Sequence, residues 1–399
     1  MALYSHDTQG LGHVRRNSLL AAAIVATDPD VSVLLLSGAR EAVSLPLPER
    51  TEVVVVPGIA KDRTGRYSSR FPGCSLPQVV AMRAAVAEAV LASYAPDVLV
   101  VDKWARGFRG ELEPAIRRLR EEHGTRTVLG LRDVLDDVET TRREWAADGT
   151  TEAIDSLYDE VWAYTDPTVF DPAEVYGWER CVRAKVRYPG YLGSGRARLL
   201  PSATGPYGAR PALPELRRPF VLGLVGGGQD GEAVVASFLD ASFPAGHDGV
   251  LVAGPYLPGP LLAAAERTAA RRPDLRVYRF VADVPRLTRA ASAIVTMGGY
   301  NSVCEVVVSR RPALVVPRVR PRGEQALRAA HFARRGLLDV ACGDHLGADD
   351  LTRWLSAAVG TRPAGRPPVD LGGLGRVPAL AAGLVGRPVG PARRTADVG

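Results

Sequence analysis

The stretch from Ala291 to Leu338 reads ASAIVTMGGYNSVCEVVVSRRPALVVPRVRPRGEQALRAAHFARRGLL and follows the order strand, glycine turn, helix, strand, helix. The apolar run Ala293–Val295 ends at Gly298-Gly299, and Asn301-Ser302 then open a segment with valines on one helical face. Glycines let a ligand approach the backbone closely, and the first-turn N–H groups together with the helix dipole attract an anion. The stretch therefore predicts a site for a phosphate group, presented by Gly299, Asn301 and Ser302.

Three further features favour a nucleotide-diphosphate pocket over an ordinary glycine turn capped by Asn or Ser. Glu305 lies one turn into the predicted helix, where a carboxylate can hold ribose hydroxyls beside a pyrophosphate. Gly228-Gln229 closes a glycine loop that follows another strand and opens a helix, which predicts a second nest of N–H groups. Glu324-Gln325 begins a helix after an irregular loop, and both side chains can bind sugar hydroxyls.

The N-terminal segment SHDTQGLGHVRR, residues 5–16, is the second candidate site. It has Gly10-x-Gly12 but Arg15 where a dinucleotide fingerprint has its third glycine, which argues against a nicotinamide cofactor. His13 at a helix N-terminus is expected to stay neutral and to accept a proton from a hydroxyl, with Asp7 orienting the imidazole or binding an acceptor. The alternatives are a capping or packing histidine and a turn-forming aspartate.

Polar residues at the strand ends of the N-terminal half form a weaker third candidate. Asp102-Lys103 and Arg132-Asp133 follow predicted strands, and with Gly12 they would line the acceptor side of a cleft. Solvated loops are the alternative for most of them. The remaining histidines show no metal-ligand spacing, so no metal site is predicted.

Composition predicts a soluble two-domain protein. The chain has 399 residues, with 46% apolar and 24% charged residues, and no apolar run approaches the roughly 20 residues of a membrane span. The first residues lack the features of a signal peptide, so a cytoplasmic location is expected. The four cysteines are far apart, which disfavours disulfides and structural zinc.

The net charge of +6 comes almost entirely from arginine. No stripe of basic and aromatic residues appears, so no nucleic-acid partner is predicted. A weak peripheral contact with anionic lipid at the inner membrane face remains open. The oligomeric state is not predicted.

Strand-like and helix-like segments alternate along the chain, which predicts α/β architecture with parallel sheets covered on both faces. In the first half, strands are expected at residues 2–5, 31–36, 53–56, 98–101, 128–131, 161–164 and 182–186, with a polar loop at 62–77. The alternation restarts at Phe220. The predicted division is 1–205 for the acceptor domain, 206–218 for a linker, 219–360 for the donor domain, and 361–399 for a tail that packs back in part and ends in disorder.

Several motifs resemble those of a known family. The segments GGGQ, RFVADV, GGYNSVCE and GEQ resemble the C-terminal domain of family 28 glycosyltransferases, which include the bacterial enzyme that adds N-acetylglucosamine to lipid I. The segments SHDTQGLGHVRR, DKWARGFRGEL, LGLRD and YPGYL resemble a bacterial group known as predicted glycosyl transferases. Together these motifs span roughly residues 1–345.

The resemblance implies a GT-B fold, two doubly wound Rossmann-like domains facing across a cleft, and a metal-independent inverting transfer from a nucleotide sugar, most often a UDP-sugar. It places Glu305 on ribose, the turn at Gly299–Ser302 on the diphosphate, Val281 at the base and Gln325 at the donor sugar. His13 matches the family histidine. The lipid-linked enzyme has a fuller glycine run and an arginine near its interdomain junction that YPGYL does not supply, so neither a lipid acceptor nor N-acetylglucosamine is carried over.

The sequence thus predicts a glycosyltransferase with a nucleotide sugar and a hydroxyl acceptor as small-molecule partners and no bound cofactor. It would act in cell-surface glycan or specialised-metabolite biosynthesis. A nucleotide-sugar epimerase of the same fold and a non-catalytic sugar-nucleotide-binding protein are the alternatives.

Overall fold

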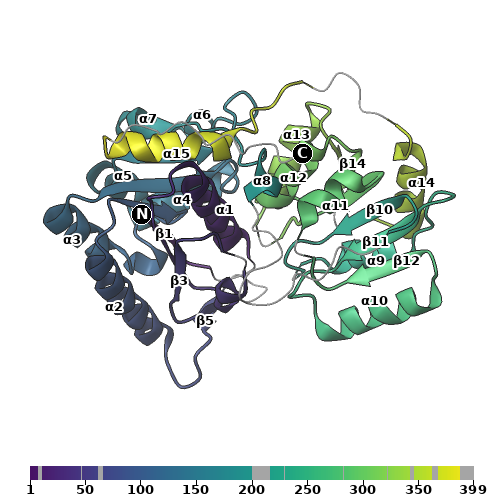
Figure 1. Ribbon diagram of the computed structural model, residues 1–399, viewed down its shortest axis with the longest axis horizontal. Helices are drawn as coiled ribbons and strands as arrows, with labels where there is room; N and C mark the ends of the chain where they lie inside the picture. The colour runs from purple at the N-terminus through teal and green to yellow at the C-terminus, as the bar shows by residue number, and fades with distance from the viewer. Residues whose placement is uncertain are drawn as a thin grey trace.

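In the computed structural model of the protein, two lobes lie side by side (Figure 1). The structure describes residues 1–7, 11–45, 47–61, 66–199, 216–228, 230–281, 283–320, 322–341, 346–361 and 367–386. Most of the predicted linker (206–215), Gln229, Cys342 and the predicted disordered end (391–399) lie outside these ranges.

The N-terminal lobe is built on a seven-stranded sheet whose strands are all parallel. In spatial order its strands are β3 (Thr51–Val55), β2 (Val33–Ser37), β1 (Ala2–Ser5), β6 (Val98–Asp102), β7 (Arg126–Arg132), β8 (Glu160–Tyr164) and β9 (Val186–Arg187). The order reverses at β1, so the ends of β1 and β6 mark the switch point where ligands of such sheets bind.

Both faces of this sheet are buried, which explains why its strands are continuous apolar runs. Leu3 pairs in register with Leu35 and Val100, and all three pack into the core on one face. Tyr4 and Leu36 point to the opposite face and pack into a second core. The first core continues into the C-terminal lobe, so the two lobes share apolar packing.

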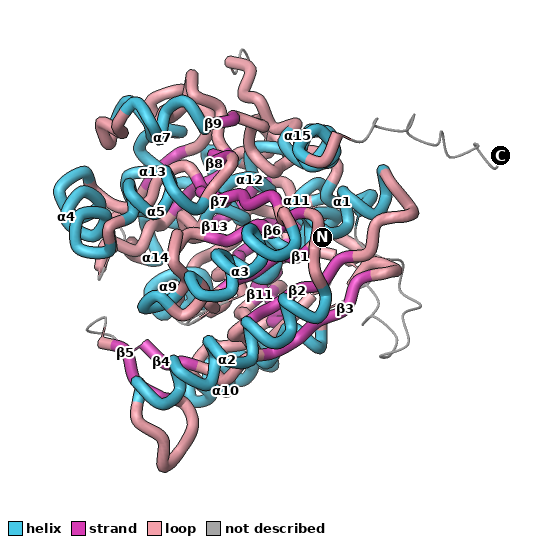
Figure 2. Tube along the Cα trace, turned by 90° about the vertical axis from the view of Figure 1, so that its left-hand side faces the viewer, coloured by secondary structure: helices cyan, strands magenta, loops and turns pink. Residues whose placement is uncertain are grey.

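The helices of this lobe cover the sheet on both faces, as Figure 2 shows in cyan around the magenta strands. They are α1 (Gly12–Thr27), α2 (Leu76–Tyr94), α3 (Glu113–His123), α4 (Val138–Asp148), α5 (Thr150–Leu157), α6 (Pro172–Val175), α7 (Arg180–Lys185) and α8 (Arg196–Leu199), with 3₁₀ turns at Arg40–Ser44 and Phe108–Gly110.

Two local predictions are wrong. The predicted strand at 182–186 is mostly the helix α7, because Val182 is the buried position of a short amphipathic turn rather than part of a sheet. The predicted loop 62–77 contains β5 (Tyr67–Ser69), which pairs antiparallel with β4 (Ile59–Lys61). Within the polar segment, Tyr67 packs on Phe108, and this contact supplies the apolar anchor of the hairpin.

The C-terminal lobe repeats the design with a six-stranded parallel sheet. Its strands in spatial order are β12 (Leu275–Tyr278), β11 (Asp248–Val252), β10 (Phe220–Leu224), β13 (Ala293–Thr296), β14 (Ala313–Val315) and β15 (Asp339–Val340). Its helices are α9 (Glu232–Asp240), α10 (Gly259–Arg271), α11 (Val284–Ala290), α12 (Tyr300–Ser309), α13 (Glu324–Ala333) and α14 (Ala348–Ala358). This order reverses at β10, beside β13.

The last helix, α15 (Gly373–Leu384), returns to the N-terminal lobe and packs on α1, as the yellow helix of Figure 1 shows. The apolar residues of the tail drive this docking, since Val377 and Leu374 are buried in the shared core. The backbone of Asp370 fixes the approach, because its carbonyl accepts from the N–H of Tyr191 at 2.8 Å.

Buried polar contacts join the lobes. The Tyr300 hydroxyl donates to the carbonyl of Tyr164 at 2.8 Å and accepts from the N–H of Leu192 at 3.1 Å. Arg328 of α13 forms an ion pair with Asp133 at 2.7 Å, and both side chains are 1% exposed. These contacts hold the lobes in a closed arrangement.

One helix in the described ranges, α2, is long and apolar enough to span a membrane, judged by its length and composition only. In its apolar stretch, 22% is buried inside the protein. Core helices of soluble proteins share this length and hydropathy. Cys74, Cys181 and Cys304 are free thiols.

Candidate active site

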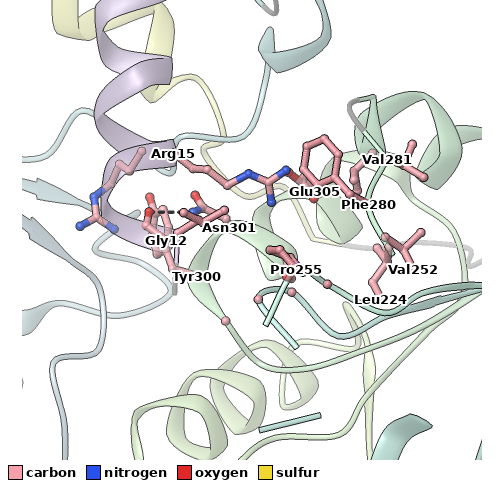
Figure 3. A pocket seen from close by; sticks show the side chains of 18 of the residues that line it. Gly12, Arg15, Leu224, Val252, Pro255, Phe280, Val281, Tyr300, Asn301 and Glu305 are labelled. Atoms are coloured by element: carbon pink, nitrogen blue, oxygen red, sulfur yellow. Dashed lines mark hydrogen bonds between the residues drawn. The ribbon is translucent and has the colours of Figure 1, made fainter. Parts of the chain in front are cut away.

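A cavity of about 180 Å³ lies between the lobes, at the switch points of both sheets. Figure 3 shows the first turn of α1 on one side of it and strand ends and loops of the C-terminal lobe on the other. The residues of the N-terminal lobe that line it are Leu11, Gly12, His13, Arg15, Arg16 and Arg132.

His13 lies in the first turn of α1, and its ring is positioned by contacts at Nδ1. Its Nδ1 lies 2.8 Å from Oδ2 of Asp102, which ends β6, and 3.0 Å from Nη2 of Arg16. Of these two neighbours only the carboxylate can accept a proton held on Nδ1, and that tautomer leaves Nε2 as the acceptor. Arg16, one turn along α1, also donates to Asp102 through Nη2. Strand β6 thus positions the histidine through one buried carboxylate.

Burial is the largest influence on the pKa of His13 and lowers it below its usual 6.5. Asp102 opposes this effect, while Arg16 and Arg132 reinforce it. Burial raises the pKa of Asp102, but Arg16 and His13 outweigh it and hold that pKa far below its usual value. At neutral pH the pair is a neutral imidazole beside a carboxylate, the charge state that a general base requires.

Asp7 does not orient the imidazole, in contrast to the prediction. Its Oδ2 accepts from the hydroxyls of Ser37, at 2.7 Å, and Ser5, and its Oδ1 accepts from the N–H of Val14 at 3.2 Å. Asp7 therefore caps α1 and ties it to the ends of β1 and β2. The carboxylate beside His13 belongs to Asp102, which the sequence placed only on the acceptor side.

The opposite wall is the N-terminus of α12. Gly299 is its N-cap residue, no side chain caps it, and no acidic residue occupies its first turn. Gly299, Asn301 and Ser302 all line the cavity, so the first-turn N–H groups and the positive end of the helix dipole are available to an anion. The glycine turn capped by Asn or Ser, the alternative interpretation, is not what the structure shows.

Asn301 and Glu305 line the cavity while making contacts across the lobe boundary. The Asn301 amide donates to the carbonyl of Gly12 at 3.0 Å, the dashed line in Figure 3. Arg196 of α8 pairs with Glu305 at 3.1 Å and donates to the Asn301 side-chain oxygen at 3.0 Å. An arginine therefore does lie at the lobe boundary, although not in YPGYL: Arg196 follows Tyr188 by eight residues.

The glycine loop after β10 contributes Gly226 and Gly227 to the cavity, whereas Gly228 does not line it. Gly228 has φ +91°, and a Cβ there would lie 2.5 Å from the Ala253 carbonyl oxygen. Its glycine is required for packing against the neighbouring loop, and its role in donor binding stays a prediction. Val281 does line the cavity, beside Phe280.

Three other predicted site residues lie away from this cavity. Asp133 is buried in its ion pair with Arg328, so it does not face an acceptor, in contrast to the prediction. Glu324 is 4% exposed and pairs with Arg318, and the Gln325 side-chain oxygen accepts from the N–H of Arg318 at 3.2 Å. Gln325 nevertheless adjoins the turn at Gly298-Gly299, because a Cβ on Gly298 would lie 2.8 Å from the Gln325 carbonyl oxygen.

Sequence reasoning did not single out Arg16, Arg196 or Tyr300 as site residues. The available signal for Arg16 was its i,i+3 spacing from His13, which places both side chains on one face of α1. Arg196 and Tyr300 act across the lobe boundary, and no local pattern reports such pairing. In the parts of the chain that the structure describes, no three His, Cys, Asp or Glu side chains gather as metal ligands.

No protein family and no curated protein matches the chain by sequence. Among solved structures, it is similar to a protein assigned as a UDP-N-acetylglucosamine 2-epimerase from Listeria monocytogenes, with TM-score 0.59, 12% identity and 97% of each chain covered. It is also similar to the glycosyltransferase VinC in complex with dTDP, with TM-score 0.54, 16% identity and coverage of 96% of this chain and 95% of that one. MurG from Acinetobacter baumannii gives TM-score 0.51 and 12% identity over 98% and 96% of the two chains.

The chain has the GT-B fold. This confirms the predicted fold class of two Rossmann-like domains that face one another. In this GT-B chain, the cavity lies where the carboxyl ends of both sheets meet. Identities below 20% support the architecture alone, because one fold hosts many different chemistries.

Proposed function

We propose that the chain is a glycosyltransferase that moves a sugar from a nucleotide-sugar donor, with UDP as the expected nucleotide, to an acceptor hydroxyl. One observation carries this proposal. A histidine paired with a buried carboxylate faces an uncapped helix N-terminus across a single cavity, which places a proton acceptor opposite an anion site.

In the proposed reaction, Nε2 of His13 takes the proton of the acceptor hydroxyl as the oxygen attacks the anomeric carbon. The bond from that carbon to the diphosphate oxygen breaks, and the nucleoside diphosphate leaves with the electron pair. The N–H groups at Asn301 and Ser302 stabilise its negative charge, a role that a metal ion takes in other enzymes. Attack from the face opposite the leaving group inverts the anomeric configuration.

Donor binding requires the lobes to open. The cavity of about 180 Å³ is below the 300–1,000 Å³ of typical ligand sites. The Arg196–Glu305 and Asn301–Gly12 contacts occupy the groups proposed for ribose and diphosphate. A bound donor would replace both contacts with its own hydroxyl and phosphate oxygens.

A nucleotide-sugar epimerase is the second candidate, because the neighbour with a TM-score of 0.59 carries that assignment. An epimerase needs no acceptor and converts the donor alone. A non-catalytic sugar-nucleotide-binding protein would bind the nucleotide and turn over nothing.

The test uses wild type, His13→Ala and, as a matched control, His123→Ala at the exposed end of α3. Thermal shift against UDP-, dTDP- and GDP-sugars identifies the donor, since ligand that binds only the folded form raises the melting point. Mass spectrometry then detects product from an acceptor panel. We expect H13A to retain donor binding but lose roughly 10²–10⁴-fold in turnover, with H123A unchanged.

Other results would favour the competing functions. Conversion of the donor sugar in the absence of acceptor, seen by NMR, would establish the epimerase. Nucleotide binding that is equal in all three proteins, without turnover in any, would establish the binding protein. EDTA treatment and the anomeric coupling constant of the product test metal independence and inversion.

A further inference from the structure

Lys103 and Arg132, at adjacent strand ends near the cavity, lack a counter-ion among the described residues, although four arginines around them each have one. Arg16 pairs with Asp102, Arg328 with Asp133, Arg322 with Asp136 and Glu144, and Arg318 with Asp230 and Glu324. Lys103 and Arg132 form no ion pair with any carboxylate in the described ranges, and both are partly buried. An unpaired charge removed from water is costly, and such groups concentrate at functional sites.

Lys103 and Arg132 come from adjacent strand ends on the acceptor side of the site. Lys103 directly follows Asp102 at the end of β6, and Arg132 ends β7, which pairs with β6. The N–H of Lys103 donates to the Gly130 carbonyl at 3.0 Å, which links the two strand ends. Arg132 also lines the cavity with His13.

Unsatisfied polar atoms mark the same region. The Arg132 Nε and the Trp104 Nε1 are buried donors with no described partner, and Lys103 Nζ lies 5.0 Å from the centre of the Trp104 ring. His6, which is 3% exposed and stacks edge-on with His13 at 4.9 Å, has an unpartnered Nδ1. Lys103 has φ +72°, a strained backbone for a non-glycine residue, and such strain is common at binding sites.

We propose that Lys103 and Arg132 form a subsite for a carboxylate or phosphate group that a substrate carries in addition to the donor diphosphate. This inference rests on the proposed function, because it assigns the anion to the acceptor or to the transferred sugar. Both residues belong to the N-terminal lobe, the predicted acceptor domain, which favours the acceptor as the substrate that carries the anion. The diphosphate itself is assigned to α12, on the other wall.

The electrostatics agree with this subsite. Burial, with Arg322 and Arg132 nearby, lowers the pKa of Lys103 to about 7, while Glu144 and Glu324 oppose this effect. Burial, with Arg328 and Arg16, lowers the pKa of Arg132 to about 10. Glu324 faces the same cations, but it already pairs with Arg318 and leaves the positive charge in excess. A bound anion would raise the pKa of Lys103 and draw a proton onto it.

The first experiment titrates sulfate, which does not itself take up a proton near neutral pH, into protein saturated with UDP. Trp104 emission is the readout, assigned by its loss in Trp104→Phe. We expect sulfate to bind with proton uptake at pH 8, measured by calorimetry in buffers of different ionisation enthalpy. Lys103→Met and Arg132→Met should each weaken it about tenfold or more, since each removes a charge-assisted hydrogen bond.

Arg109→Met is the matched control, because Arg109 lies in the same loop, is exposed, and its loss changes the net charge equally. It should change sulfate affinity less than twofold. Lys103→Met and Arg132→Met should melt no lower than wild type, because each removes an uncompensated charge. Melting well below wild type would show that these cations serve the fold, and would overturn the proposal.

A second experiment separates the sources of the anion and needs no turnover, so it stands even where the proposed transfer fails. UDP-glucuronic acid binding weakened tenfold by either variant, with UDP-glucose binding unchanged, assigns the anion to the transferred sugar. Equal binding of both donors, with sulfate still bound beside UDP, assigns it to the acceptor. Exclusion of sulfate by UDP, or a tenfold loss of UDP affinity in either variant, would show that these residues hold the diphosphate and would overturn the proposal.

Discussion

Replacing Asp102 with Asn tests the proposed base most directly, because it removes one charge and almost no volume. Asp102 has two partners: its Oδ2 lies 2.8 Å from His13 Nδ1, and both oxygens accept from Arg16. The carboxylate and guanidinium side chains are 3% and 2% exposed, so water cannot replace either partner. The substitution therefore affects both catalysis and stability.

The catalytic cost follows from the charge that develops on His13 as it takes the proton. With charge centres roughly 4 Å apart and an effective dielectric constant of about 20, the carboxylate stabilises the imidazolium by about 4 kcal/mol. This energy corresponds to a factor of roughly 10³ in rate. Because Arg16 neutralises part of the carboxylate's charge, the effect on the imidazolium is smaller than this. We therefore expect kcat/KM to fall roughly 10²–10³-fold. The stability cost is about 3–5 kcal/mol, because Arg16 is left buried without a counter-ion.

The assay measures kcat/KM against pH, together with thermal unfolding. The wild-type rate should stay constant above pH 6.5 and fall only in more acidic solution, because the pKa of His13 is lowered and the neutral ring is the active form. Asp102 raises that pKa, so the acid limb of Asp102→Asn should move to lower pH. The melting temperature should drop by roughly 6–20 °C, at 2–4 °C per kcal/mol for a lobe of this size.

Two further variants separate catalysis from folding. In His13→Ala/Asp102→Asn, the rate should be no lower than in His13→Ala alone, because the two residues act as a unit. Arg16→Met/Asp102→Asn should regain most of the lost stability without regaining the rate. Full turnover by Asp102→Asn at a temperature where it is folded would refute the role of Asp102 in catalysis.

Three further predictions concern stability, and thermal unfolding measures each of them. Arg328→Met should cost about 3–5 kcal/mol because it leaves Asp133 charged and buried, and Arg328→Met/Asp133→Asn should recover most of this loss. Gly228→Ala should lower the melting point more than Gly246→Ala: both glycines have positive φ, but only a Cβ at 228 meets another atom, the Ala253 carbonyl oxygen at 2.5 Å. Equal losses would contradict the packing account of Gly228. The melting temperature should also fall as the pH drops below 6.5, because burial lowers the pKa of His6 and His13 and the unfolded chain then binds protons that the folded chain does not. His6→Gln should flatten this dependence, whereas an unchanged curve would mean that His6 takes its proton in the folded state.

The sequence was sufficient for those features that each segment determines by itself. Strands buried on both faces are continuous apolar runs, and for this reason β1, β6 and β13 were predicted within a residue or two. The turn at Gly298-Gly299 and the start of α1 near His13 were also predicted, because glycine conformation and helix spacing depend on adjacent residues. The predicted strand at 182–186 failed because a short apolar run fits one helical turn as well as one strand.

The partners of the site residues were beyond such reasoning, because they depend on how distant segments meet. Asp7 follows the end of one strand and Asp102 is the last residue of another, and nothing adjacent to either one shows which of them faces His13. The strand order decides the matter: β6 lies beside β1, so its last residue emerges next to the first turn of α1. The ion pair of Asp133 with Arg328 could not be predicted for the same reason, because the two residues are 195 positions apart in the sequence.

In the closed arrangement, the groups of the site differ in whether the protein itself supplies their partners. Arg196 neutralises Glu305, and Asn301 bonds to Gly12, so the groups proposed for the donor satisfy one another across the lobe boundary. A nucleotide sugar would compete with these contacts and exchange them for its own, which keeps the net cost of opening small. No such internal substitute exists for Lys103 and Arg132 among the described carboxylates. The protein therefore bears their unpaired charge until a ligand arrives, which is why an anionic substrate group is the inference that this site supports.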